Sequence, residues 1–255
     1  MSIGRDRVSV ITVCRNAQDL IRRTILSVLE QTYPYIEFIV VDGQSSDGTR
    51  DILEAFADKI DVYISEKDNG IYDAMNKGIR KATGKWLCFM NAGDTYAHQN
   101  VISDIFSNSA DYNGKMVVYG DFVIEGSHQI IKASDMSAIE HRMPFCHQSA
   151  FLRNEGFVFR TDLQIASDYA LFYEIYKEYG ASAFFYTDSI ISVFNMEGVS
   201  VQNQKRLYEE YSRLHIEHRK YLYGFYYMLS SYCRILKHCI FSSLKICKDN
   251  KQDLS

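Results

Sequence analysis

The amino-acid sequence predicts an α/β fold in which a mostly parallel sheet is flanked by helices. In the first half of the chain, short apolar runs alternate with segments whose apolar residues recur at helical spacing, as in βαβ units. The runs are apolar throughout, which strands need when helices cover both faces of their sheet. Three of them end in polar residues, and ligands of such sheets bind at the carboxyl ends of the strands.

The first predicted strand covers residues 8–13 and ends at the polar segment Cys14-Arg15-Asn16. Apolar residues at helical spacing predict a helix over 20–29. A fully apolar strand follows at 38–41 and ends at Asp42-Gly43. The polar segment Asp47-Gly48-Thr49 then opens a second helix, which reaches Phe56.

A third strand is predicted at 62–64, a helix at 71–82 and a fourth strand at 86–90, which ends in Asn91-Ala-Gly-Asp94. The second half is less regular, and 121–146 is predicted to be mixed loop. The remaining predicted elements are strands at 117–119, 183–186 and 190–194, and helices at 167–179 and 202–222.

The composition is that of a globular protein with its own core. The 255 residues are 47% hydrophobic and 24% charged, and a net charge of -4 argues against nucleic acid as a partner. The six cysteines have no zinc-ligand spacing, which favours a reducing compartment. There is no apolar signal segment, and no apolar run approaches the ~20 residues of a membrane span. We therefore expect a cytoplasmic protein with a main domain over 1–200 and a helical extension over 201–255.

Four ordered motifs carry the functional prediction. They are the segments VSVITVCRN (8–16), VVDGQSSDGT (40–49), NGIYDAMNKG (69–78) and GKWLCFMNAGD (84–94). Together they resemble the nucleotide-sugar-binding half of the inverting family-two glycosyltransferases, whose GT-A fold has a Rossmann-like, mostly parallel sheet. The resemblance is close over 8–94 and looser to about Tyr179. It implies a donor-binding half at about 8–95 and an acceptor half at about 96–200.

The resemblance implies a nucleoside-diphosphate sugar as donor, with UDP as the expected nucleotide. The donor-binding residues that it implies are Val13, Cys14, Asn16, Asp42, Asp73 and Asn91. Asp42 would accept a hydrogen bond from uracil or ribose; the alternative is a turn or cap aspartate, a role for which Asp47 is better placed. The family often has two adjacent aspartates where this chain has Asp42-Gly43. Asp73 and Lys77 would border the diphosphate or ribose, unless they lie on a solvated helix face.

Residues 91–94 stand where the family has its metal-binding Asp-x-Asp motif. A divalent cation there stabilises the charge that develops on the leaving diphosphate, and hard cations such as Mn²⁺ or Mg²⁺ favour carboxylate oxygen. Here Asp94 is the acid that remains, because Asn91 and Gly93 occupy the other two places. The alternative is a simple turn at the end of the strand.

Asp168 matches the family's catalytic base, which removes the proton of the acceptor hydroxyl during inverting transfer. An aspartate at a helix start could instead be an N-cap, although Ser167 could take that role. The resemblance also places His147 and Gln148 on the acceptor side. A structural histidine is the alternative for His147.

The C-terminal stretch combines aromatic and basic residues. Between Arg219 and Lys251 there are seven Lys or Arg residues and one acid, Asp249, among many tyrosines and phenylalanines. Rings at an interface and cations near anionic head groups are typical of a helix on a membrane surface, and a core-packing helix is the alternative.

The expected function is therefore sugar transfer to a polyprenyl-pyrophosphate-linked glycan in surface polysaccharide assembly (O-antigen, lipopolysaccharide or capsule), at the inner face of the cell membrane. The alternative is a non-catalytic nucleotide-sugar-binding module that serves a partner protein. A dinucleotide-binding enzyme is excluded, because no GxGxxG motif follows the first strand.

Overall fold

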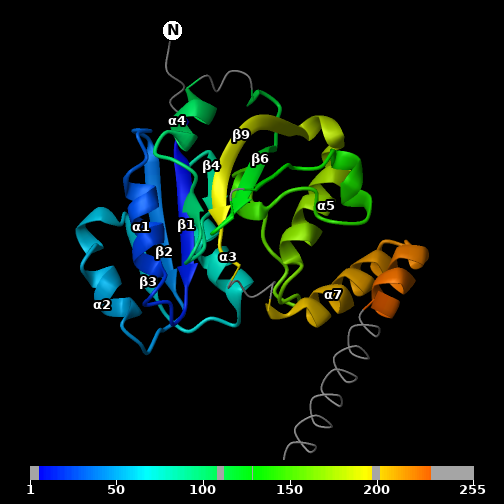
Figure 1. Cartoon of the computed structure of the whole chain (residues 1–255), viewed down its shortest axis with the longest axis horizontal. Coiled ribbons are helices and arrows are strands. Elements are labelled where there is room, and N and C mark those ends of the chain that lie inside the picture. The colour runs from blue at the N-terminus through cyan, green and yellow to red at the C-terminus, as the bar shows by residue number, and fades with distance from the viewer. Residues whose placement is uncertain (1–5, 108–111, 128, 197–201, 231–255) are drawn as a thin grey trace, which may run out of the picture. The chain divides into compact units, whose positions relative to one another are not determined.

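The computed structural model describes residues 6–107, 112–127, 129–196 and 202–230, which form two compact units, 1–198 and 199–255 (Figure 1). The boundary expected at residue 200 lies outside the described residues. The first unit contains one sheet with the strand order β3-β2-β1-β4-β8-β6-β9-β5, and β7 pairs with β6. This arrangement confirms the α/β prediction.

The parallel part of the sheet lies in the first half of the chain. It consists of β1 (Val8–Cys14), β2 (Ile36–Asp42), β3 (Val62–Ser65) and β4 (Trp86–Phe89). Every residue of β1 and β4 is buried, as the uninterrupted apolar runs predict. The carboxyl ends of these strands therefore lie at one edge of the sheet.

The second half extends the sheet with mixed pairing. It contributes β5 (Thr95–Tyr96), β6 (Val117–Ile124), β7 (Ile130–Ile131), β8 (Ala150–Arg153) and β9 (Phe184–Phe194). β8 runs antiparallel to both β4 and β6, whereas β6 and β9 are parallel. The two strands predicted within 183–194 are one strand, whose pairing with β6 is irregular around Asp121.

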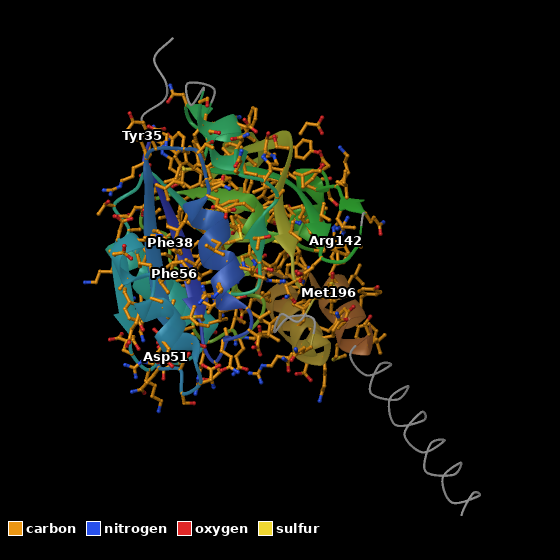
Figure 2. All side chains as sticks on the ribbon, turned by 60° about the vertical axis from the view of Figure 1, so that its left-hand side comes forward. Tyr35, Phe38, Asp51, Phe56, Arg142 and Met196 are labelled. Atoms are coloured by element: carbon orange, nitrogen blue, oxygen red, sulfur yellow. The ribbon has the colours of Figure 1, made fainter. Side chains whose placement is uncertain are left out.

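The helices of the first unit are α1 (Ile21–Leu29), α2 (Thr49–Glu54), α3 (Ile71–Lys81), α4 (Val101–Phe106) and α5 (Ser167–Tyr179). Short 3₁₀ segments cover Ala57–Lys59, Met136–Glu140, His147–Ser149 and Ala181–Ala183. Helix α3 packs on β1 and β2. Phe38 of β2 and Phe56, which follows α2, are labelled in Figure 2. They belong to the buried core together with Trp86 and Phe106.

The second unit contains α7 (Gln204–Glu217) and a further helical segment over 221–230. The prediction of one helix over 202–222 is wrong, because Arg219 has a φ of 60° and the chain turns there. The turn lets Tyr227 stack on Tyr211, with ring centroids 5.1 Å apart. None of the helices described is long and apolar enough to cross a membrane.

A buried carboxylate joins three neighbouring segments of the parallel sheet. Glu37 of β2 accepts hydrogen bonds from Ser9 Oγ of β1 at 2.5 Å, and from the backbone N–H and Oγ1 of Thr83, each at 2.7 Å. Burial raises the pKa of Glu37, but these hydrogen bonds and the charge of Arg7 outweigh it, so the pKa lies below its ordinary value.

We predict that Glu37→Gln lowers the free energy of unfolding at neutral pH by about 1.5–3 kcal/mol, because an ionised acceptor is lost. A lowered folded-state pKa stabilises the fold above the unfolded pKa, and that stabilisation is lost as the pH falls through the folded value. The difference between variant and wild type should therefore shrink below about pH 4 in denaturant titrations. Glu30→Gln, at the exposed end of α1, is the control and should show neither effect.

Candidate active site

The loops after β1, β2 and β4 meet at the carboxyl edge of the parallel strands. Cys14 and Asp42 are register partners, and the backbone N–H of Gly43 donates to the carbonyl of Cys14 at 2.8 Å. The carbonyl of Val13 accepts from the N–H of Ala92 at 3.2 Å. These contacts bring together the strand ends at which the sequence places the donor.

Asp42 is fully buried at this edge. Its carboxylate accepts hydrogen bonds from Ser45 Oγ at 2.5 Å, from Ser65 Oγ at 2.7 Å and from the backbone N–H of Ser45. Burial beside this carboxylate raises the pKa of the Cys14 thiol well above its usual range. Asp42 thus anchors the 43–46 loop, and its contact with a donor stays a prediction.

Asn16 and Asp47 hold the neighbouring turn. The side-chain oxygen of Asn16 accepts from the N–H of Ser46 at 2.9 Å, and Asn16 has a φ of 51°. Asp47 accepts from the N–H groups of Thr49 at 3.0 Å and Gln18 at 3.2 Å. The structural role expected for Asp47 is therefore present.

Asp68 is a further candidate site residue, outside the set that the sequence predicts. A Cβ atom placed on Gly43 would lie 2.1 Å from Asp68 Oδ2, so the Asp68 carboxylate fills the space of a side chain at position 43. Asp68 is half-buried, and its Oδ1 accepts from the N–H of Gly70 at 3.1 Å. The sequence signal that could have pointed to Asp68 is Gly43, which stands where the family often has a second aspartate.

Asp73 and Lys77 lie on α3, but not on a solvated face. Lys77 is buried and its ammonium contacts the carbonyl of Lys67 at 2.7 Å, Glu66 at 3.1 Å and Asp73 at 3.6 Å. Asp73 also accepts from the N–H of Asn69 at 3.0 Å. The pair therefore braces the loop between β3 and α3.

The 91–94 loop after β4 is held by Thr24 of α1. The buried Thr24 hydroxyl accepts from the N–H of Gly93 at 2.9 Å and lies 2.8 Å from the carbonyl of Asp94. Gly93 has a φ of 105°, where a side chain is strained. An acid at this position therefore conflicts with the backbone of the loop.

Asp94 is buried, and each of its oxygens accepts one hydrogen bond. Oδ2 accepts from Gln148 Nε2 at 2.8 Å, and Oδ1 accepts from the backbone N–H of Asn195, which follows β9, at 2.8 Å. Burial raises the pKa of Asp94 to about 6, although both hydrogen bonds oppose the shift. Gln148 is therefore a partner of the candidate metal ligand.

Within the described residues, no group of three His, Cys, Asp or Glu side chains is placed to hold a metal ion. The hard oxygens present are the Asp94 carboxylate, with lone pairs to spare, and Asn91 Oδ1, which is buried without a hydrogen-bond partner. Diphosphate oxygens would complete such a set, so the residues fit a Mn²⁺ or Mg²⁺ ion bound together with a nucleotide.

Asp168 lies in the first turn of α5, with its side chain 18% exposed. Oδ2 is 2.9 Å from His147 Nδ1, and Oδ1 accepts from the N–H of Tyr169 at 2.8 Å and lies 3.3 Å from the Tyr72 hydroxyl. The other ring nitrogen of His147 is 3.2 Å from Asn91 Nδ2. Asn91, His147 and Asp168 thus form one chain of contacts.

The expectation that Ser167 caps α5 is wrong. Its buried Oγ has no hydrogen-bond partner among the described groups, and the helix has no side-chain cap at Ala166. Since His147 and Gln148 are adjacent, the contacts of Asp168 and Asp94 meet in one 3₁₀ turn, His147–Ser149. The structure therefore joins the predicted base to the predicted metal ligand.

The sequence matches known proteins over its first two thirds. The model of Glycosyl transferase family 2 matches residues 9–163. A PGL/p-HBAD biosynthesis glycosyltransferase of Mycobacterium bovis is 30% identical over 149 residues, 57% of this chain and 58% of that protein. TuaG of Bacillus subtilis, a candidate glycosyltransferase of teichuronic acid biosynthesis, is 41% identical over 99 residues, 38% of this chain and 39% of TuaG. The chain thus matches a little over half of the length of the M. bovis protein and less than half of the length of TuaG.

Solved structures share the fold at lower identity. TarS residues 1–349 of S. aureus in complex with UDP has a TM-score of 0.64 and 17% identity, and the match covers 82% of this chain and 64% of that one. The mannosyltransferase PcManGT of Pyrobaculum calidifontis with GDP-Man and Mn²⁺ has a TM-score of 0.65 and 18% identity, over 85% and 65% of the two chains. The chain therefore has the GT-A fold and belongs to glycosyl transferase family 2.

Proposed function

We propose that this protein transfers one sugar from a nucleoside-diphosphate sugar, with UDP as the nucleotide, to an acceptor hydroxyl with inversion. The observation that carries the proposal is the link between Asp168 and Asp94 through the adjacent residues His147 and Gln148. A base and a diphosphate-binding loop must be neighbours for transfer, whereas a binding module needs no base. The family membership, and the UDP and GDP-Man complexes of neighbours in fold, support the same donor class.

In the proposed reaction, Asp168 accepts the proton of the acceptor hydroxyl as the hydroxyl oxygen bonds to the anomeric carbon. The bond between that carbon and the diphosphate oxygen breaks on the opposite face, and the nucleoside diphosphate leaves. The charge that develops on the leaving group would be neutralised by Mn²⁺ or Mg²⁺ held at Asp94 and beside Asn91 Oδ1. The partial exposure of Asp168 leaves its carboxylate accessible to the acceptor.

On the donor side, we propose that Asp68 contacts the base or ribose in place of the enclosed Asp42. Asp68 is half-buried and fills the side-chain space beside Gly43, whereas Asp42 is fully buried with both oxygens bonded. A carboxylate there accepts hydrogen bonds from an imide N–H or a ribose hydroxyl. The nucleotide would be bordered by Val13, Cys14 and Asn16. Asp73 would act indirectly, by holding the loop between β3 and α3 in place.

For the acceptor, we propose a glycan on a polyprenyl-pyrophosphate lipid in surface polysaccharide assembly, reached at the inner face of the cell membrane. In the second unit the helical segment 221–230 exposes seven large hydrophobic side chains. Four of them recur at helical spacing and are named here the exposed stripe: Leu222, Phe225, Tyr226 and Leu229. Their exposed fractions are 87%, 55%, 61% and 46%. Such a face suits the interfacial zone of a bilayer. The basic residues from Arg234 to Lys251 lie outside the described residues.

The base assignment predicts a split between turnover and binding. Asp168→Asn keeps the side-chain shape but does not accept the proton, so kcat should fall about 10²–10⁴-fold while the Kd for UDP stays unchanged. Asp68→Asn should do the reverse, weakening UDP binding with kcat near wild type. Steady-state kinetics and calorimetric UDP titration check both variants. An Asp168→Asn enzyme with wild-type kcat would remove the base from the mechanism.

The metal assignment predicts that excess chelator abolishes transfer and that Mn²⁺ or Mg²⁺ restores it, because the leaving diphosphate needs charge neutralisation. Asp94→Asn should weaken Mn²⁺ binding in the presence of UDP, measured by electron paramagnetic resonance. Thermal unfolding of the variant separates this loss from damage to the hydrogen bonds of Gln148 and Asn195. Full activity in chelator would exclude Asp94 as a metal ligand.

The membrane assignment predicts that Leu222→Ser/Leu229→Ser lowers co-sedimentation with phosphatidylglycerol-containing vesicles, since apolar burial is lost. High salt should release part of the wild-type protein, because exposed charges are screened within about 8 Å at physiological ionic strength. Val158→Ser, at a residue of the first unit that is 59% exposed, is the matched control. Equal sedimentation of all three proteins would contradict a membrane-facing stripe.

A further inference from the structure

Three side chains from distant parts of the first unit form a chain of polar contacts. Asn91 follows β4, His147 lies in the 3₁₀ turn before β8, and Asp168 lies in α5. Asn91 Nδ2 is 3.2 Å from His147 Nε2, and His147 Nδ1 is 2.9 Å from Asp168 Oδ2. An amide, an imidazole and a carboxylate are thus arranged in order.

When the ring of His147 is neutral, the chemistry of these groups gives each of the two hydrogen bonds one direction. An ionised carboxylate only accepts, so His147 Nδ1 carries the proton that it donates to Asp168. The neutral ring then has a lone pair on Nε2, which accepts from the amide nitrogen of Asn91. Asn91 therefore selects the ring tautomer that can hold Asp168.

We propose that His147, oriented by Asn91, is a positioning residue for the base rather than part of the acceptor site. This inference rests on the proposed function, in which Asp168 takes the acceptor proton. The ring of His147 is held by a contact at each of its nitrogens, and the side chains of His147 and Asp168 are 17% and 18% exposed. The adjacent Gln148, bonded to Asp94, ties the same turn to the 91–94 loop.

The proposal also gives a reason for asparagine at a position where the family has an acid. Aspartate at residue 91 has no proton to donate to His147 Nε2, so the ring would either take the opposite tautomer or become an imidazolium between two carboxylates, and a cationic ring bonded to Asp168 makes that carboxylate a weaker base. Aspartate keeps an oxygen where Asn91 Oδ1 lies, however. Asn91→Asp should therefore lower kcat through its effect on Asp168, while an oxygen remains at the position of Asn91 Oδ1.

The test is a set of substitutions at His147 in the full-length protein, followed by steady-state kinetics, UDP titration and thermal unfolding. His147→Ala should lower kcat about 10- to 100-fold, because a misplaced reacting group costs up to about 10² in rate. The KM for the acceptor and the Kd for UDP should stay within about twofold. His147→Asn, whose amide lies near the position of Nδ1, should recover part of the loss, whereas His147→Gln, with its amide near Nε2, should not.

Asn91→Asp provides the second arm. It should lower kcat about as much as His147→Ala, and the double variant should be no slower than His147→Ala, because both changes remove one contact chain. His98→Ala, an exposed histidine after β5, is the control and should keep wild-type kcat. Additive effects of the two changes, or a loss confined to acceptor KM, would overturn the proposal.

Asp168→Asn separates this inference from the proposed function. If Asp168→Asn is inactive and His147→Ala retains wild-type kcat, the positioning role is wrong and the base assignment stands. If neither substitution affects kcat, the assignment of Asp168 as the base in the proposed function fails, and the positioning role fails with it. Should His147→Ala not fold, as thermal unfolding would reveal, the comparison between the Asn and Gln variants decides the matter.

Discussion

The buried carboxylate of Asp94 is the constraint on which the rest of the site depends. Its two oxygens accept hydrogen bonds from segments 54 and 101 residues away, at Gln148 and Asn195. Loss of either partner would leave the buried charge of Asp94 incompletely hydrogen-bonded, at a cost on the order of several kcal/mol. The loop after β4, the turn before β8 and the end of β9 are therefore held together, and His147 takes its place from that turn.

The acids of this protein differ in exposure and in hydrogen bonding. Glu37 and Asp42 are buried and accept hydrogen bonds from serine or threonine side chains, so they join strands and loops. Asp168 and Asp68 are half-buried, which suits the contacts with acceptor and donor proposed for them. Position in a motif alone does not distinguish these cases, because Asp42 stands in a donor motif and yet is enclosed.

The sequence predicts the parallel part of the fold well, because its strands are apolar throughout and its helices are clearly periodic. Helix α5 has the predicted bounds, Ser167–Tyr179. Strands β5 and β8 and helix α4 escaped prediction, since they are short and are stabilised by pairing or packing with distant segments. Residues 187–189 lie outside the two strands that the sequence predicts, whereas the structure has one strand there, with an irregular register against β6.

For the site, the resemblance named Asp94, His147, Gln148 and Asp168, but not how they pair. The contacts of His147 with Asp168 and of Gln148 with Asp94 depend on loop conformations that no periodic pattern encodes. Asp68 was missed for a related reason. Its carboxylate reaches the space beside Gly43 from a different loop, and a sequence read position by position does not reveal such a replacement.

The backbone at Gly93 has a consequence for how this enzyme could have diverged. With φ at 105° and its N–H bonded to Thr24, the loop accepts glycine far more readily than any acid. A single mutation back to aspartate would restore a carboxylate only at the expense of the loop geometry that orients its neighbours. The departure from two acids is therefore difficult to reverse by a single substitution at Gly93.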